Sequence, residues 1–255
     1  MAGALSVLEY NLVGYRTTWR SSVFSSFVSP LFFLAAMGVG LGGLVQQRTG
    51  TVGGVDYLSF LAPGLLAATA MQAATVESTY PIMAKVKWLR IYEGVLATPV
   101  GVADIVVGEL AFIAVRLLMV ACVNLVVMML FGVPRTPLAL LAIPAAMLTG
   151  LAFAAPIMAF SATQSDDVGF SALNRFIVLP LFLLGGAFFP LSQLPVVLQG
   201  AALVFPLSHG VALTRDAVLG DLSVAAAATH VAVLVAFIGV GAPLARRLLE
   251  RRLVV

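Results

Sequence analysis

Long apolar stretches, separated by short polar connections, make up almost the whole of this chain. Of its 255 residues, 61% are hydrophobic and only 10% carry a charge. Soluble domains have a far more polar composition. Because a helix needs about 20 apolar residues to cross a bilayer, the chain has room for about six crossings and none for a soluble domain. We therefore expect an all-α polytopic membrane protein, forming a single domain over residues 1–255.

The polar and glycine-rich connections between the apolar stretches set the expected boundaries. Residues 46–56 and 133–137 have the composition of loops, and the sequence ATQSDD ends another apolar stretch. The six expected transmembrane helices cover residues 22–44, 57–80, 103–132, 138–162, 170–187 and 222–245.

Two segments outside these spans predict helices at the membrane surface. Residues 4–19 are amphipathic at helical spacing and flanked by aromatic residues, which is typical of an interfacial helix. Residues 84–98 form a polar island that carries both signs of charge and stops at Pro99 and Gly101. Mixed charge favours docking to a protein over binding to anionic lipid. An ordinary cytoplasmic loop is the alternative for this island.

A third segment, residues 188–208, is apolar but broken by Pro190, Pro195 and Pro206. These prolines are incompatible with one straight span. The pattern predicts two short helices that enter the membrane and return, with their irregular backbone buried against protein. The following sequence TRDAVLGD, residues 214–221, is expected to be a loop.

The distribution of Lys and Arg predicts the orientation. On the six-span arrangement three basic residues (Arg48, Arg135 and Arg215) fall on one side, and Arg116 falls within the third span. The positive-inside rule places the richer side, with both termini and residues 84–98, in the cytoplasm. The net charge of +3 thus reflects topology, and we expect no nucleic-acid partner. The richer side holds ten basic residues: Arg16, Arg20, Lys85, Lys87, Arg90, Arg175, Arg246, Arg247, Arg251 and Arg252.

The sequence carries no pattern typical of an enzyme. The dipeptide Gly-Lys never occurs, so a GxxxxGK[ST] phosphate loop is absent, as are HExxH and GxSxG. A single cysteine, Cys122, excludes a disulfide or a cysteine metal cluster within the chain. His209 is expected to be a turn or interface residue and His230 a packing residue. We expect no catalytic residue, no metal site and no cofactor in this chain.

Three ionisable residues, Glu77, Glu109 and Arg116, are expected near or within the membrane. A charge in hydrocarbon costs several kcal/mol unless it is paired or hydrated. Glu109 and Arg116 are two helical turns apart and share a face, and Glu77 lies at the end of the neighbouring span. We hypothesise that Glu77 or Glu109 pairs with Arg116 and joins spans two and three. The alternative places both carboxylates at the cytoplasmic interface.

In four segments the chain resembles the permease subunits of ABC-2 type exporters, most closely the nodulation protein J group and less closely the daunorubicin-resistance permeases. FLAPGLLA, and FFPLSQLP followed by PLSH, are the more specific matches. The resembling segments are YLSFLAPGLLAATAMQAATVESTY (57–80), YEGVLATPVGVADIVVGELA (92–111), LTGLAFAAPIMAFSA (148–162) and GGAFFPLSQLPVVLQGAALVFPLSHGVALTRDAVLG (185–220).

The resemblance implies a half-transporter of the bacterial plasma membrane that works as a dimer with two copies of a separate ABC ATPase, which binds ATP and Mg. It implies that residues 4–19 are a connecting helix, 84–98 a coupling helix on the ATPase, and 188–208 an outer re-entrant hairpin. The expected coupling residues are Lys87, Trp88, Arg90, Tyr92 and Glu93, and the hairpin residues are Phe189, Pro190, Pro195, Pro206 and His209.

The expected mechanism is alternating access driven by ATP, in which spans one, two and five part. The named families export lipo-oligosaccharides or amphipathic drugs, and the apolar spans favour an amphipathic or lipid-like cargo. Two other functions stay open. A proton-coupled secondary carrier would titrate Glu77 or Glu109 during transport, and a non-transporting scaffold would tolerate charge changes in residues 84–98.

Overall fold

The computed structural model describes residues 2–44, 50–134 and 136–253, and these residues form helices joined by short connections, without a β-strand. The all-α expectation is thus confirmed. Arg48 and Arg135, with the first part of the expected loop at 46–56, lie outside the described residues. Within the described part, five helical segments are long and apolar enough to cross a membrane, and one bent helix pair brings the number to six at most.

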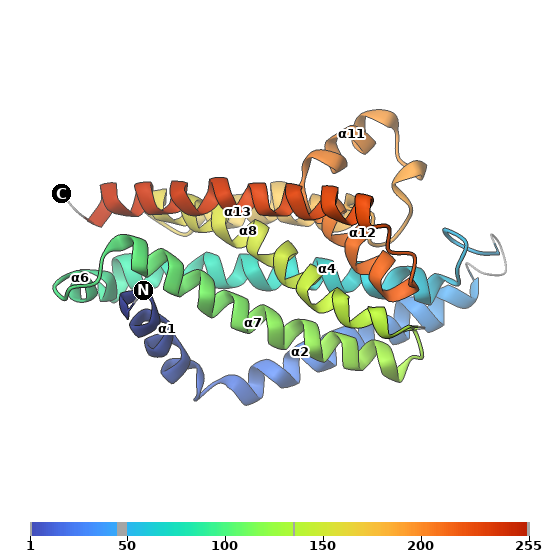
Figure 1. Cartoon of the computed structure of the whole chain (residues 1–255), viewed down its shortest axis with the longest axis horizontal. Coiled ribbons are helices and arrows are strands. Elements are labelled where there is room, and N and C mark those ends of the chain that lie inside the picture. The colour runs from blue at the N-terminus through green and yellow to red at the C-terminus, as the bar shows by residue number, and fades with distance from the viewer. Residues whose placement is uncertain (1, 45–49, 135, 254–255) are drawn as a thin grey trace.

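The five long segments agree closely with the expected first, second, third, fourth and sixth spans. Their ranges are Trp19–Leu44, Tyr57–Trp88, Val102–Leu130, Pro137–Thr163 and Val224–Leu253. In Figure 1 they correspond to α2 (Trp19–Phe33) with η1 (Leu34–Leu41); α4 (Tyr57–Ser78) with α5 (Tyr80–Met83) and η2 (Ala84–Trp88); α7 (Val102–Leu130); η3 (Pro137–Leu141) with α8 (Ala142–Thr163); and α13 (Val224–Leu253).

The shorter elements include the helices expected outside the spans. The helix predicted over residues 4–19 corresponds to α1 (Ala2–Tyr15), and the polar island holds η2 and the short helix α6 (Ile91–Leu96). The remaining elements are α9 (Val168–Leu173), η4 (Asn174–Val178), α10 (Leu179–Leu184), η5 (Leu191–Gln193), α11 (Val196–Val204) and α12 (Pro206–Leu219).

The polar island differs from the expected single helix over residues 84–98. The helix of span two continues past its expected end at residue 80 as far as Trp88. Arg90 then adopts a left-handed conformation, with φ of 48°, and α6 starts directly after it. This reversal confines the separate surface helix to Ile91–Leu96.

The expected fifth span is shorter than its neighbours. α9, η4 and α10 form one apolar helical segment, Val168–Leu184. At about 1.5 Å per residue it is about 26 Å long, slightly less than the roughly 30 Å of a hydrocarbon core. It ends before residue 187 because Gly186 takes a positive φ of 85°, which terminates the helix.

The segment after it forms the expected proline-broken pair of helices, but its second arm is longer than predicted. α11 and α12 meet at an angle of 85°, and α12 continues to Leu219, so residues 214–219 are helical and the expectation of a loop there is wrong. Most of α12 is buried, against α4, α8 and α13. The charged pair Arg215 and Asp216 suggested a loop, yet Arg215 is accommodated by backbone carbonyls described below.

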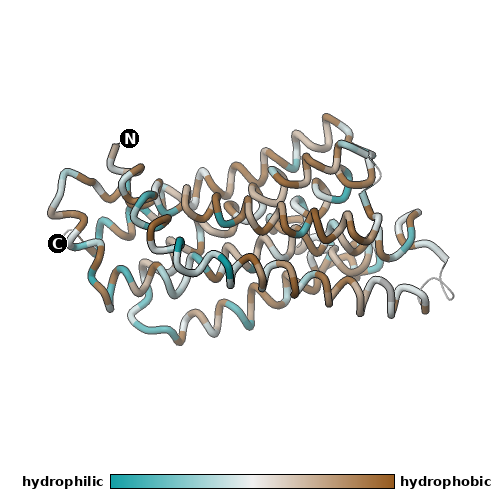
Figure 2. Tube along the Cα trace, turned by 90° about the horizontal axis from the view of Figure 1, so that it is seen from below, coloured by the Kyte–Doolittle hydropathy of each residue, from teal (hydrophilic) through white to brown (hydrophobic). Residues whose placement is uncertain are grey.

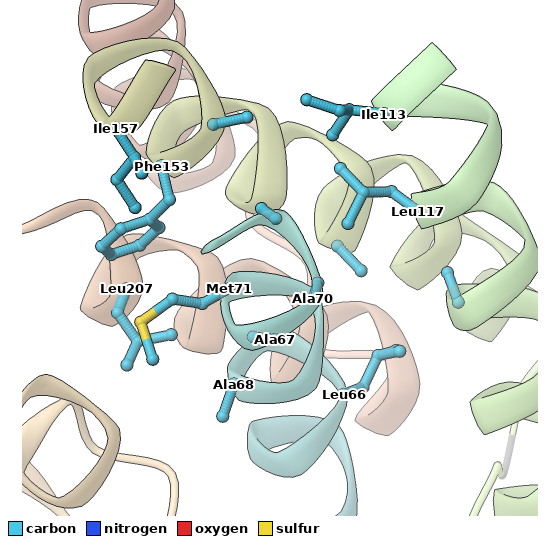
Figure 3. Packing of buried hydrophobic residues seen from close by; sticks show 14 of the residues in the cluster. Leu66, Ala67, Ala68, Ala70, Met71, Ile113, Leu117, Phe153, Ile157 and Leu207 are labelled. Carbon is cyan, nitrogen blue, oxygen red and sulfur yellow. The ribbon is translucent and has the colours of Figure 1, made fainter. Parts of the chain in front are cut away.

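The helix α4 is the centre of the fold. Its N-terminus is capped by Asp56, whose carboxylate accepts a hydrogen bond from the Ser59 amide at 3.0 Å. α7, α8 and α12 surround it. Figure 3 shows its small and medium side chains enclosed by these three neighbours. The labelled core residues are Leu66, Ala67, Ala68, Ala70 and Met71 of α4, with Ile113, Leu117, Phe153, Ile157 and Leu207 around them.

The two described ends of the chain lie at the same end of the bundle as α6 (Figure 1). Hydrophilic residues gather mostly towards this end, and the middle of the bundle is largely hydrophobic (Figure 2). The arrangement agrees with an even number of crossings.

Glycines allow close contact between helices at several crossings. On α13, a Cβ atom added to Gly241 would lie 2.6 Å from the Pro156 nitrogen of α8, whereas a Cβ at Gly239 would meet nothing within 4 Å. These two glycines, two residues apart on one helix, make a matched pair.

We expect Gly241→Val to lower the thermal unfolding temperature of the detergent-purified protein by several degrees, because overpacking costs about 1–3 kcal/mol. Gly239→Val carries the same change in helix propensity and should leave that temperature nearly unchanged. Thermal unfolding followed by size-exclusion chromatography measures both. Equal shifts would contradict the close contact between α8 and α13.

Candidate functional site

A buried polar cluster joins four elements at the end of the bundle that carries α6. The Lys85 ammonium of η2 lies 2.7 Å from both carboxylate oxygens of Glu109 on α7 and 2.7 Å from the Asn11 side-chain oxygen of α1. The Tyr92 hydroxyl of α6 donates to Glu109 at 2.9 Å. Glu109 is almost fully buried. The cluster holds α1, α6 and α7 against the end of span two.

Tyr92 is itself buried, with 2% of its surface exposed. Burial, followed by the adjacent Glu109 carboxylate, raises the pKa of the Tyr92 phenol well above its usual range. The phenol therefore stays protonated and remains a hydrogen-bond donor to Glu109 at any physiological pH.

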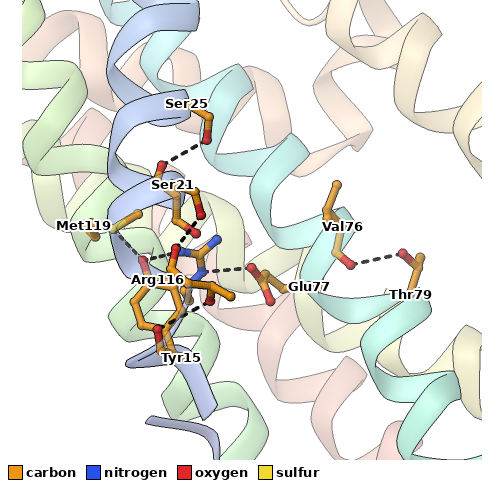
Figure 4. Close-up of polar contacts among 10 residues, drawn as sticks. Tyr15, Ser21, Ser25, Val76, Glu77, Thr79, Arg116 and Met119 are labelled. Carbon is orange, nitrogen blue, oxygen red and sulfur yellow. Dashed lines mark hydrogen bonds and ion pairs between the residues drawn. The ribbon is translucent and has the colours of Figure 1, made fainter. Parts of the chain in front are cut away.

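A second polar cluster lies deeper in the bundle, around Arg116, the central residue of α7. Its guanidinium donates from Nε to Glu77 of α4 at 2.8 Å and from Nη1 to the Tyr15 hydroxyl of α1 at 2.5 Å. The guanidinium carbon also lies 4.4 Å from the centre of the Tyr15 ring. Figure 4 shows Arg116 between Tyr15 and Glu77. Of the two carboxylates considered as its partner, the structure selects Glu77.

The two clusters connect the same parts of the chain, and together we call them the polar clamp. α7 contributes Glu109 and Arg116, and span two with its extension contributes Lys85 and Glu77. α1 contributes Asn11 and Tyr15, one helical turn apart, and α6 contributes Tyr92. The α6 end of span two is thereby held to α1 and α7 together.

The residues next to the clamp form an exposed tip, defined here as residues 87–90 together with Glu93. Trp88 and Leu89 expose 55% and 65% of their surface. Arg90 and Glu93 are exposed and form a loose ion pair at 3.9 Å. Lys87 donates to the Ser165 carbonyl in the connection between α8 and α9. Apolar side chains flanked by both charges suit a protein partner.

Of the five expected coupling residues, four therefore lie on the tip, and Tyr92 points inward to the clamp. Lys85 and Asn11 were not predicted as partners of Glu109. Lys85 was counted only as a topology signal. A lysine and a glutamate flanking the turn between two spans were a usable signal of pairing, whereas the contact of Asn11 depends on the tilt of α1.

At the opposite end of the bundle, each of the three prolines of the expected hairpin begins a helix. Pro190 precedes η5, Pro195 precedes α11, and Pro206 is the first residue of α12, a position that needs no amide hydrogen. Phe189 is partly buried beside Pro190. The hairpin residues thus define where its helices start.

His209 and His230, expected to act separately, lie together. Their Nδ1 atoms are 2.7 Å apart, and His209 Nε2 lies 2.9 Å from the Leu203 carbonyl. Since a carbonyl only accepts, Nε2 carries the hydrogen. The pair joins α12 to α13. In the part of the chain that the structure describes, no group of three or more His, Cys, Asp or Glu residues could hold a metal ion.

The ion pair at Arg116 should be measurable as a coupling energy. Arg116→Leu leaves Glu77 without its partner, which for a buried pair costs about 3–5 kcal/mol. We expect the double variant Glu77→Leu/Arg116→Leu to unfold at a higher temperature than Arg116→Leu alone. Thermal unfolding of the two single variants and the double variant measures this. Strictly additive effects would contradict a direct pairing.

Comparison with known proteins relates this arrangement to a transporter family. A family model described as "ABC-2 type transporter" matches residues 5–219. The chain is 35% identical to Nodulation protein J of Rhizobium leguminosarum bv. trifolii over 249 residues, covering 98% of this chain and 93% of the relative. It is 33% identical to Nodulation protein J of Rhizobium meliloti over 249 residues, with the same coverage.

A more distant relative is named as a permease. Over 222 residues the chain is 28% identical to the inner membrane transport permease YadH of Escherichia coli, covering 84% of this chain and 82% of the relative. The range that the family model matches, residues 5–219, contains the polar clamp, the tip and the bent pair α11–α12.

Proposed function

Because the chain belongs to the ABC-2 type transporter family, and so is a permease subunit of an ABC transporter, we propose that it forms the membrane half of an ATP-driven exporter. In this proposal two copies of the chain pair in a bacterial plasma membrane, with both termini in the cytoplasm. Two copies of an ABC ATPase, each binding ATP and Mg, dock on the cytoplasmic side. The catalytic step then belongs to the ATPase, and this chain moves an amphipathic cargo.

The observation that carries the proposal is the direct attachment of the exposed tip to the buried polar clamp. The tip offers Trp88, Arg90 and Glu93 to a partner. Lys85, just before the tip, and Tyr92, between Arg90 and Glu93, both reach inward to the carboxylate of Glu109. A displacement of the tip by the ATPase is thereby passed to α1 and α7. Without such a rigid link, docking would move only a surface loop.

ATP binding supplies the bias in this mechanism, because a conformational change needs a ligand with different affinities for its two states. Closure of the ATPase pair would move the two tips and, through the clamps, spans one, two and three. The short segment Val168–Leu184 packs loosely and exposes much of its apolar surface, which allows it to shift relative to the bundle.

A proton-coupled carrier receives less support from the structure. Both candidate carboxylates are held in ion pairs, Glu77 with Arg116 and Glu109 with Lys85, at 2.8 and 2.7 Å. Each carboxylate thus already serves to join two segments of the bundle. Family membership points in the same direction.

Charge reversal on the tip tests the docking step. We expect Arg90→Glu or Glu93→Arg to abolish most of the co-purification of an ABC ATPase with the tagged protein in mild detergent. Arg246→Glu is a matched control, because Arg246 forms a comparably exposed pair with Glu250 at the same end of the bundle; it should retain the ATPase. Recovery of wild-type protein without any ATPase would contradict the proposed function.

The clamp can be tested separately from docking. Tyr92→Phe removes only the hydroxyl that donates to Glu109. Since Tyr92 is buried, the ATPase should co-purify at the wild-type ratio, whereas stimulation of ATP hydrolysis by cargo should fall several-fold in proteoliposomes. The half-exposed Tyr10 provides the control variant Tyr10→Phe. Loss of the ATPase in Tyr92→Phe would show that this residue acts in docking and not in coupling.

A further inference from the structure

An apolar groove runs along the surface of the chain between α2 and α7. Its volume is about 460 Å³. The groove is open to the outside, because Phe24 in its wall exposes 69% of its surface and Val126 exposes 50%. In the membrane this surface borders on lipid, unless another protein covers it. The walls include Trp19, Arg20, Phe24 and Phe27 of α2 with Cys122 and Val126 of α7.

One end of the groove is polar and lies where span one begins. Trp19 and Arg20 line this end, and Trp19 is the first residue of the span Trp19–Leu44. In Figure 1, α2 starts towards the end of the bundle that carries α6. Tryptophan and arginine are typical of the boundary between headgroups and hydrocarbon. Phe27, two helical turns further along α2, lines the groove about 10 Å deeper. The groove therefore leads from this boundary into the hydrocarbon.

The positive charge at this end is not offset by an acidic side chain. Arg116 pairs with a glutamate, whereas among the described residues neither Arg20 nor Arg16 forms an ion pair. No carboxylate from that part of the chain lines the groove either. The Arg20 guanidinium carbon lies 5.6 Å from the centre of the Trp19 ring, a contact that leaves its charge in place. This end of the groove therefore suits an anionic group.

The apolar walls and the basic end together select the occupant. Apolar walls alone give no preference, because acyl chains are as apolar as leucine side chains. Selectivity comes from the basic end, since one basic residue near the membrane surface favours an anionic lipid by about fivefold. A zwitterionic headgroup would bring its own cation close to Arg20, and a soluble anion would not fill the walls. A lipid with a net negative headgroup fits both parts of the groove.

We propose that this groove binds one anionic glycerophospholipid of the surrounding membrane. The phosphate contacts Arg20, and one acyl chain lies between Phe24 and Cys122. The lipid is a bound component of the protein and not its cargo. It packs the start of α2 against α7 just after Tyr15, which belongs to the polar clamp, so the bound lipid steadies the clamp. The inference requires neither an ATPase nor a particular orientation in the membrane.

The first test uses Trp19 as a reporter of the lipid beside it. The chain contains two tryptophans, so Trp88→Phe leaves Trp19 as the single indole. This variant is reconstituted into phosphatidylcholine vesicles with a minor fraction of brominated lipid, whose bromine atoms quench indole fluorescence at contact. Brominated phosphatidylglycerol should quench Trp19 more than brominated phosphatidylcholine, with an apparent preference of about fivefold. Equal quenching by the two lipids would overturn the proposal.

Removal of the basic charge tests the headgroup contact. Arg20→Gln, in the same background, should remove most of the preference for phosphatidylglycerol. Arg175→Gln is the matched control, because Arg175 is also an exposed arginine but lies on η4, outside the groove. The control should keep the preference. An equal loss in both variants would assign the effect to the net charge of the protein and would contradict a site at Arg20.

A second test fills the groove and measures stability. Phosphatidylglycerol added to the detergent-purified protein should raise its thermal unfolding temperature by several degrees, because a ligand of the folded state stabilises it, and phosphatidylcholine should not. Cys122→Phe places a ring in the groove and should abolish this rise. Val115→Phe is the control on the same helix, since Val115 is 39% exposed but lies outside the groove. A rise that persists in Cys122→Phe would contradict binding of an acyl chain there.

A second copy of the chain is the other occupant to test. Cys122 is the single cysteine and is exposed in the groove, so an oxidant would join two copies through it if their grooves faced each other. We expect no such dimer in vesicles. Its formation, together with weak quenching of Trp19 by both brominated lipids, would overturn the proposal. These tests omit the ATPase, so their failure and the failure of the proposed export function are distinguishable.

Discussion

A charge inside hydrocarbon must have a partner, and the ion pair between Glu77 and Arg116 meets this requirement at the middle of the bundle. The pair cannot form unless α4 and α7 lie side by side, and the Tyr15 hydroxyl can reach Arg116 only if α1 is tilted against both. The placement of α1, and with it the start of span one, thus depends on one guanidinium. The Lys85 and Glu109 pair repeats the requirement nearer the tip.

The opposite end of the bundle meets the same constraint with backbone carbonyls. Close to α12, α10 ends and Pro63 of α4 supplies no backbone N–H, so carbonyl groups there need other donors. Arg215 donates to the Phe60 and Gly186 carbonyls, and Thr214 donates to the Pro63 carbonyl at 2.9 Å. α12 is fixed in the bundle by side chains that bond the backbone of its neighbours. This explains how the second arm of the bent pair α11–α12 can be a core element.

The sequence alone was sufficient for the features set by hydrophobicity and proline. Five of the six predicted apolar helices, the helix at the start of the chain and the proline-broken helix pair follow from composition and from where prolines can stand. The helical spacing of Glu109 and Arg116 also predicted a shared face. The partner of Arg116 could not be chosen, because Glu109 shares a face of the same helix and Glu77 lies at the end of the neighbouring span, within reach of the same guanidinium. The contact of His209 with His230, and the helical residues 214–219, depend on packing between distant segments, which local patterns do not contain.

The charges of the clamp alternate in a way that bears on how the protein is assembled. Along α7 the order is acid then base, Glu109 and Arg116, and along span two it is acid then base again, Glu77 and Lys85, but the two helices run in opposite directions. Only one register brings unlike charges together at both levels. Sliding one helix by two turns would place Glu77 opposite Glu109, or Lys85 opposite Arg116. The hairpin formed by span two and α7 can therefore align its two helices by these charges before the remaining spans join.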